Sequence, residues 1–241
     1  MTSATTVERL FGHYQKYTRR ATPADPATRR LAFGTFERTL KGSLPEDHQA
    51  AILDIGCGSG ALLHFLGAHG YHNLRGFDIS PENVEICRAA GLAFVERHNA
   101  LETTSFAPGA QFDTIFALDV LEHIPKPAAA AFIEQVRGRL RPGGMAVVQT
   151  VNAGNVHACF HWCNDLSHEF AVNERAVVDL FMLGGFDEQD IEVLPAWSAT
   201  TAAGLLREVY LRLLHQVIWL AEGSARPRIE TRNLLIRARR R

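Results

Sequence analysis

The sequence predicts an α/β fold in which strands and helices alternate around one core. A short apolar run at 51–55 is followed by Gly56, Gly58 and Gly60, and then by apolar residues at helical spacing in 62–66. This order is typical of a strand, a tight turn and a helix that open a nucleotide-binding unit. Similar strand-like and helix-like stretches alternate to the C-terminus, and 241 residues of which 46% are hydrophobic can bury one substantial core.

Composition restricts the class of protein. The formal net charge is −1, and no basic stripe attracts nucleic acid, so we expect no nucleic-acid partner. The four cysteines do not predict a disulfide framework, because Cys57 lies inside the glycine turn. The first residues lack the apolar core of a signal peptide, and no run reaches the length of a membrane span. We therefore expect a cytoplasmic protein without a transmembrane segment.

The chain begins with two stretches that have helical periodicity, 5–20 and 27–41, which Pro23 and Pro26 separate. We expect residues 1–45 to form a helical cap before the main domain at 46–241. This cap either covers the ligand cleft that the glycine turn predicts or packs on the edge of the sheet.

The first half of the main domain continues the alternation. A second strand is expected at 73–77, and Ser80 and Pro81 then suit the cap and first turn of a helix that Gly91 ends. Short strand 94–97 follows. Residues 112–118 are apolar enough to form a central parallel strand.

The second half alternates in the same way. The turn sequence Arg141-Pro142-Gly143-Gly144 separates a helix from a strand, and Gly184-Gly185 ends a later helix. The expected elements are helix 127–140, strand 145–151, helix 174–183, strand 191–194, helix 202–222 and strand 233–239.

An insertion at 196–231 precedes the last strand and contains the amphipathic helix 202–222. Its stripe consists of Leu206, Val209, Tyr210, Leu213, Leu214, Val217, Leu220 and Ala221. Four roles stay open: a lid over a substrate, a homodimer face, a peripheral membrane-surface helix, or a structural helix packed on the N-terminal pair.

Two acidic residues indicate what the glycine turn binds. Asp54 precedes the first glycine by two residues, where a carboxylate disfavours a pyrophosphate and favours a ligand that carries an ammonium and a sulfonium. Asp78 follows the second apolar run, where it can accept hydrogen bonds from ribose hydroxyls. The Asp54-to-Gly60 turn, followed by Gly76-Phe77-Asp78-Ile79-Ser80, resembles the class I S-adenosylmethionine-dependent methyltransferases.

The resemblance extends from Ile52 to Asn152, through the phrases F-D-x-I-x-A-x-D-V-L-E-H-I-P and L-R-P-G-G. It implies a Rossmann-like seven-stranded sheet of order 3-2-1-4-5-7-6 with an antiparallel last strand, and S-adenosylmethionine as cofactor. It implies these cofactor-binding residues: Asp54, Gly56, Cys57, Gly58, Gly60, Asp78, Ile79, Asn99, Ala100 and Leu118. Asn99 stands where the family often has an aspartate that meets the adenine amino group.

The methyl acceptor is expected beyond the carboxyl ends of the fourth and fifth strands, where 118–125 and the lid segment 153–172 meet. Asp119, Glu122 and His123 lie in the first segment and His168 in the second. An Asp-x-x-Glu-His group with a later histidine resembles the divalent-metal site of the ubiquinone-pathway and small-RNA 2′-O-methyltransferases, although those carry a glutamate at the position of Asp119.

Three interpretations of these residues stay open. In the first, Asp119, Glu122, His123 and His168 hold Mg²⁺ or a similar ion that activates a hydroxyl. In the second, His123 or His168 is a general base that carboxylates such as Asp119 orient. In the third, Glu122 and His123 only close the cofactor cleft.

A hydroxyl oxygen is the preferred acceptor. Resemblance of 164–178 to methyltransferases of polysaccharide assembly ranks a sugar or glycan hydroxyl first and a catechol-like phenol second. A small-amine N-methyltransferase is the rival enzyme, and a non-catalytic cofactor-binding module is the rival outside enzymes.

Overall fold

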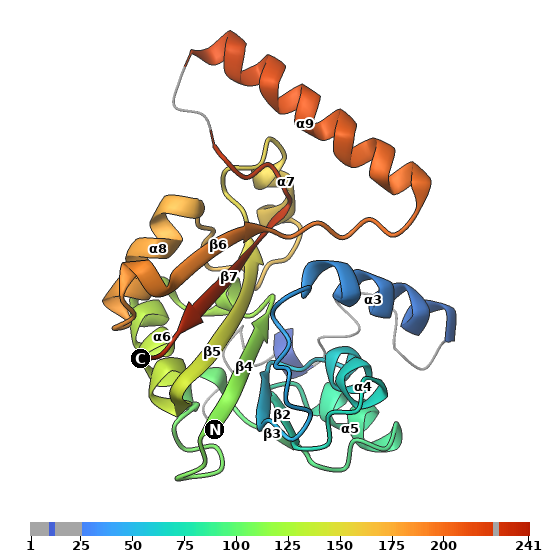
Figure 1. The fold of residues 1–241 in the computed structure, drawn as a ribbon, viewed down its shortest axis with the longest axis vertical. Helices are drawn as coiled ribbons and strands as arrows, with labels where there is room; N and C mark the ends of the chain where they lie inside the picture. Colours follow the sequence, from blue (N-terminus) through green and yellow to red (C-terminus); the bar gives the residue numbers. More distant parts are fainter. Residues whose placement is uncertain (1–9, 13–25, 224–226) are drawn as a thin grey trace.

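The computed structural model describes residues 10–12, 26–223 and 227–241, and it contains one seven-stranded sheet with helices on both faces (Figure 1). Its strands are β1 Ile52–Ile55, β2 Leu74–Asp78, β3 Val95–Arg97, β4 Phe112–Leu118, β5 Leu140–Val151, β6 Ile191–Pro195 and β7 Asn233–Arg239. The order is β3-β2-β1-β4-β5-β7-β6. Strand β7 is antiparallel to β5 and β6, whereas β1 to β5 run parallel. The predicted sheet is therefore confirmed.

Apart from α7, which lies in the segment 153–172 that we expected to be a lid, the α-helices of the described part lie close to their predicted positions. They are α3 Pro26–Thr39, α4 Ala61–Ala68, α5 Pro81–Ala89, α6 Ala129–Arg139, α7 Ala158–Cys163, α8 Glu174–Leu183 and α9 Ala202–Glu222. Ser80 caps α5 as predicted, because its side chain accepts the backbone N–H of Asn83. The predicted helix 5–20 lies outside the described residues except for 10–12, which are helical.

The glycine-rich segment 141–144 differs from the prediction. It belongs to β5 rather than to a turn before that strand, and the pairing with β4 shifts register beside it. A Cβ on Gly144 would lie 2.9 Å from the carbonyl oxygen of Arg141 and 3.1 Å from that of Phe112. Glycine thus lets an irregular strand continue where a side chain would collide with neighbouring backbone.

The core lies on both faces of the sheet, because successive strand residues point to opposite sides. In β1, Leu53 and Ile55 pack in the cluster that contains Phe132 of α6 and Phe181 of α8. Ile52 points the other way, into the cluster that Phe65 of α4 dominates. Helix α3 adds partly buried aromatic side chains to this second cluster.

The carboxyl ends of the parallel strands meet at one edge of the sheet and bring the loops that follow them together. Short 3₁₀ helices follow two of them, η1 Ala100–Glu102 after β3 and η2 Leu121–His123 after β4, with η3 Lys126–Ala128 before α6 and η4 Glu188–Asp190 before β6. In Figure 1, α9 stands clear of the sheet and connects to it through 196–201 and 227–232. None of the described helices, α9 included, has the length and apolarity needed to cross a membrane.

Candidate functional site

A pocket of about 980 Å³, measured out to its open mouth, lies over the carboxyl ends of β1, β2 and β4. Its walls come from the glycine turn, from the end of β2, from η1, from η2 and from residues 167–169. Of the predicted cofactor-binding residues it is lined by Gly56, Gly58, Asp78, Ile79, Asn99, Ala100 and Leu118.

At two positions of the glycine turn, Gly56 and Gly58, any residue with a side chain would be strained. Gly56 has φ of +65°, and a Cβ there would lie 2.6 Å from Cγ2 of Val120. Gly58 has φ of +54°, and its N–H donates to Oδ2 of Asp78 over 2.8 Å. The turn therefore needs glycine both for its backbone angles and for its approach to the loop after β4.

Asp78 is held in one orientation by donors from three residues. Besides Gly58, the backbone N–H of Ser80 donates to Oδ1 over 2.8 Å and Nδ2 of Asn83 donates to the same oxygen over 3.0 Å. Asn83 is itself buried and lines the pocket. The sequence analysis missed Asn83, although its place three residues after the helix cap is the signal that it faces Asp78.

Asp54 lies beneath the glycine turn rather than on the pocket wall. Its side chain is buried, and Oδ2 has no hydrogen-bond partner among the described residues. Burial, and then the negative charge of Asp78, raise the pKa of the Asp54 carboxyl well above its usual value. A buried carboxylate that lacks a partner is costly, so the site favours a positively charged group close to it.

Cys57 and Gly60, the other predicted cofactor residues, do not line the pocket either. A hydrogen bond with Cys87, followed by burial and by the charges of Asp54 and Asp78, raises the pKa of the Cys57 thiol. Asn99 lines the pocket, but its Oδ1 accepts the backbone N–H of Leu101 over 3.0 Å and so caps η1.

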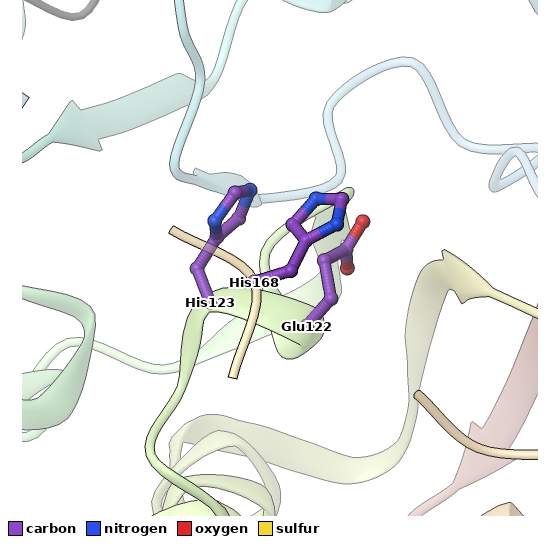
Figure 2. A group of neighbouring side chains, drawn as sticks. All are labelled: Glu122, His123 and His168. Carbon is purple, nitrogen blue, oxygen red and sulfur yellow. The ribbon is translucent and has the colours of Figure 1, made fainter. Parts of the chain in front are cut away.

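Glu122, His123 and His168 form a cluster whose candidate ligand atoms lie within 4.8 Å of one another, and of the three His123 lines the pocket. Figure 2 shows the three side chains pointing to the same side. The two imidazole ring centroids are 4.8 Å apart. Glu122 is buried and accepts a hydrogen bond from Oγ1 of Thr150 over 3.0 Å. The backbone N–H of Glu169 donates to the carbonyl oxygen of Glu122 over 2.7 Å and joins the two loops.

Asp119 lines the pocket but is not part of this cluster. Its backbone has φ of +55°. Its Oδ1 accepts hydrogen bonds from Nε2 of Gln149 over 2.8 Å and from Nδ2 of Asn233 over 3.0 Å. The structure therefore places the Asp119 carboxylate in contacts with β5 and β7.

Asp165 and Ser167 orient His123. Oγ of Ser167 lies 2.5 Å from Oδ1 of Asp165 and 2.9 Å from Nδ1 of His123. Because the serine proton goes to the carboxylate, the histidine Nδ1 must donate to Oγ, and Nε2 is the nitrogen that carries the lone pair. The sequence analysis did not assign either residue, although the spacing Asp-x-Ser-His was visible.

The Asp165 carboxyl keeps its charge in this arrangement. Burial acts to raise its pKa, but the Ser167 hydroxyl and N–H, together with the two histidines His123 and His168, outweigh burial and lower the pKa below its usual value. His168 is oriented separately, since its Nδ1 lies 2.9 Å from the carbonyl oxygen of Trp162 and must donate to it. In a neutral ring at either position, the lone pair therefore lies on Nε2.

Comparison with known proteins agrees with this geometry. A family model described as a methyltransferase domain matches residues 12–216. The ubiquinone biosynthesis O-methyltransferase of Xylella fastidiosa (strain 9a5c) is 35% identical over 107 residues, which cover 43% of this chain and 42% of that protein. The ubiquinone biosynthesis O-methyltransferase of Roseobacter denitrificans (strain ATCC 33942 / OCh 114) is 30% identical over 174 residues, 65% of this chain and 67% of that protein.

The fold is shared with solved structures. A crystal structure of an S-adenosylmethionine-dependent methyltransferase from Mesorhizobium loti superimposes with a TM-score of 0.65 and 21% identity, over 87% of this chain and 100% of that chain. In the curated relatives, the matched region spans only 42% of the Xylella protein's length and 67% of the Roseobacter protein's length.

Proposed function

We propose that this chain, which belongs to the class I S-adenosylmethionine-dependent methyltransferases, methylates a hydroxyl oxygen of a small aromatic acceptor. The observation that carries the proposal is the pairing of two sites in one pocket. The glycine turn with its two buried carboxyls lies at one end, and His123, whose ring lies beside that of His168, lines the other.

The cofactor end fits S-adenosylmethionine. Asp78 faces the pocket with two carboxylate oxygens that its neighbours hold in place, which suits ribose hydroxyls. Asp54 supplies a buried carboxyl whose Oδ2 has no described partner, which suits the positive charges of the methionyl sulfonium and ammonium. Between these two acids the glycine turn contributes backbone that can approach the cofactor closely, since the turn has no room for a Cβ at Gly56.

Bound S-adenosylmethionine supplies an electrophilic methyl group, and this chain's residues have to orient the acceptor and remove its proton. In the proposed mechanism Nε2 of His123 would take the hydroxyl proton, and the acceptor oxygen would bond to the methyl carbon as the bond from that carbon to the sulfonium sulfur breaks, which leaves S-adenosylhomocysteine. Ser167 and Asp165 hold the ring in the tautomer that can accept this proton, and the charge of Asp165 stabilises the imidazolium that results. The His168 ring lies beside that of His123, with 4.8 Å between the centroids, and from there it can position a second hydroxyl.

An aromatic acceptor is supported by the apolar wall beside His123. Phe11, Val120, Ile124 and Pro125 line the pocket there, and the Phe11 ring meets the His123 ring edge to face at 5.9 Å between centroids. The curated relatives are named ubiquinone biosynthesis O-methyltransferases, which supports an oxygen atom as the acceptor. The sugar or glycan hydroxyl that the sequence analysis ranked first has no such support, so a catechol-like phenol takes first place.

A divalent metal is a second candidate, and the donor set at the acceptor end favours it. Glu122, His123 and His168 offer one carboxylate and two imidazoles within 4.8 Å, a mixed set that suits a transition metal better than Mg²⁺, which prefers oxygen ligands. An ion held there would lower the pKa of a bound hydroxyl. In that case the chain's part would be to hold the three side chains in place, through Thr150 for Glu122 and Ser167 for His123.

The proposal is tested with purified protein, S-adenosylmethionine and three acceptors: a catechol, the matching monophenol and a simple sugar diol. Calorimetry should detect S-adenosylmethionine binding that Asp78→Asn weakens and that the exposed-site control Asp179→Asn leaves unchanged. Mass spectrometry should detect S-adenosylhomocysteine and a methylated catechol in equal amounts. Binding without turnover of any acceptor would favour the non-catalytic module, and preference for NAD would refute the proposal.

A further inference from the structure

Helix α9 presents a face of large apolar side chains to solvent along its whole length. Seven of them are exposed in the described structure: Leu205, Leu206, Val209, Tyr210, Leu213, Val217 and Leu220. Leu206 and Leu220 near the two ends are each 72% exposed, and Leu213 at the centre is 61% exposed. Monomeric proteins rarely expose so continuous an apolar surface to water, so we expect a partner to cover this face.

Contacts on the opposite side of the helix fix which face points outward. Arg38 of α3 donates to both carboxylate oxygens of Glu208, over 2.6 and 3.2 Å. His215 is buried, and its Nε2 accepts the backbone N–H of Val156. The guanidinium of Arg212 lies over the Trp197 ring at 4.2 Å from its centroid. The polar side of α9 is therefore bound to the protein body, which is the reverse of an ordinary surface helix.

The spacing of the exposed residues is typical of helix pairing. Leu206, Tyr210, Leu213, Val217 and Leu220 follow one another at intervals of four, three, four and three residues. This is the heptad spacing that makes a narrow seam between two helices. Leu206 and Leu220 lie seven residues on either side of Leu213, so an antiparallel copy of the same helix centred on Leu213 places Leu206 opposite Leu220 and brings Tyr210 within one residue of facing Val217.

We infer that the outward face of α9 is the contact surface of a homodimer, in which α9 of one protomer packs antiparallel on α9 of its partner around a two-fold axis at Leu213. Such a contact is isologous, so it closes at two copies. Burying the seven side chains on both protomers removes on the order of 1,500 Å² of surface from water, which is the size of a specific protein interface. This surface extends beyond the proposed enzymatic function and does not depend on it.

A lipid surface fits this face less well than a second helix. Membrane-surface helices carry several cations on the side that faces the headgroups. The arginines of α9 are Arg207 and Arg212, and Arg212 lies over the Trp197 ring on the opposite side of the helix, in a chain whose formal net charge is −1. At about 1 kcal/mol for each cation, two arginines attract an anionic membrane only weakly.

The oligomeric state of the full chain tests the inference. Analytical ultracentrifugation over a concentration series should give a dimer for the wild type. Leu213→Glu places two like charges face to face at the axis, and it should weaken the dimerisation constant at least about a hundredfold. The control is Leu183→Glu on α8, where the leucine is also exposed, and it should leave the constant unchanged. Circular dichroism verifies that each variant is folded. A wild type that stays monomeric, or a Leu213→Glu variant that stays dimeric, overturns the inference.

Cross-linking tests the geometry independently of any loss of folding. In a Cys159→Ser/Cys163→Ser background, which removes the two exposed thiols, Leu213→Cys should form a disulfide-linked dimer on mild oxidation. Leu183→Cys in the same background should not. If Leu213→Cys fails to cross-link, or if the wild type is monomeric and sediments with phosphatidylglycerol vesicles in a manner that Leu213→Glu abolishes, the partner is not a second copy and the inference is wrong.

Discussion

The hydroxyl oxygen of Ser167 lies 2.9 Å from Nδ1 of His123, and this contact joins the loop after β4 to the loop after β5. The Ser167 hydroxyl donates its hydrogen bond to Asp165, so the histidine can only donate at Nδ1. The lone pair of the ring then resides on Nε2. In the proposed enzyme this arrangement decides which nitrogen can accept a proton from the methyl acceptor.

Removing the Ser167 hydroxyl should slow turnover without weakening cofactor binding. In Ser167→Ala the His123 ring loses the acceptor that selects its tautomer, and we expect kcat to fall about 10- to 100-fold, a fraction of what a full general base contributes. The affinity for S-adenosylhomocysteine, measured by calorimetry, should stay within about twofold. Ser198→Ala, at an exposed site, is the matched control. Equal losses of kcat and affinity would show that Ser167 only supports the pocket's shape.

Replacing Asp54 should separate stability from cofactor binding. Because burial raises the pKa of this carboxyl in the folded protein, ionisation opposes folding at every pH above the unfolded value of about 3.9. Asp54→Asn should therefore stabilise the ligand-free protein at neutral pH, by about 1–3 kcal/mol. The gain should fade as the pH falls toward the unfolded pKa, since the wild-type carboxyl is then protonated in both states.

Urea unfolding of the ligand-free protein at neutral and acidic pH measures this difference, and calorimetry measures the expected loss of S-adenosylmethionine affinity in the same variant. Asp179→Asn serves as the exposed control. An Asp54→Asn variant that is less stable than the wild type at neutral pH would show that the carboxylate has a partner that stabilises it.

The close approach of the glycine turn to the loop after β4 should make Gly56 intolerant of a methyl group. Gly56→Ala combines a φ of +65° with a Cβ only 2.6 Å from Cγ2 of Val120. We expect S-adenosylmethionine affinity to fall at least about tenfold, which corresponds to 1.4 kcal/mol.

The double variant Gly56→Ala/Val120→Ala should recover part of this loss, because the shorter side chain removes the collision. Gly138→Ala is the control, since a Cβ on that helical residue meets nothing within 4 Å. If Val120→Ala brings no recovery, the loss comes from the backbone angles of Gly56 rather than from the contact.

Chelation should distinguish the two mechanisms of the proposed function. With His123 as the base, dialysis against EDTA should leave turnover within about twofold of the untreated enzyme. The rate should then depend on the ionisation of an imidazole, and this step should disappear from the pH profile of His123→Gln. Loss of activity that Mg²⁺ or Mn²⁺ restores, together with loss of metal binding in Glu122→Gln, would establish the metal mechanism instead.

Helix α9 shows what a sequence pattern can predict and what it cannot. Its bounds, Ala202 and Glu222, agree with the periodicity, and its apolar stripe was visible in the sequence. Periodicity alone cannot say whether such a stripe faces the core or water. The orientation of α9 depends on Arg38 and Trp197, which lie outside the helix and contact Glu208 and Arg212 on its polar side.

The sequence by itself determined where the strands and the glycine turn lie, because both depend on local chemistry, whereas the order of the strands followed only from the resemblance to the methyltransferase family. Glycines set the turn, apolar runs set the strands, and Asp54 and Asp78 stand directly beside the turn and at a strand end. Tertiary structure alone decided the acceptor end. Ser167 reaches His123 across 44 residues, and Asn233 engages Asp119 across 114, and side-chain directions at that range follow from packing and hydrogen bonds that no local spacing encodes.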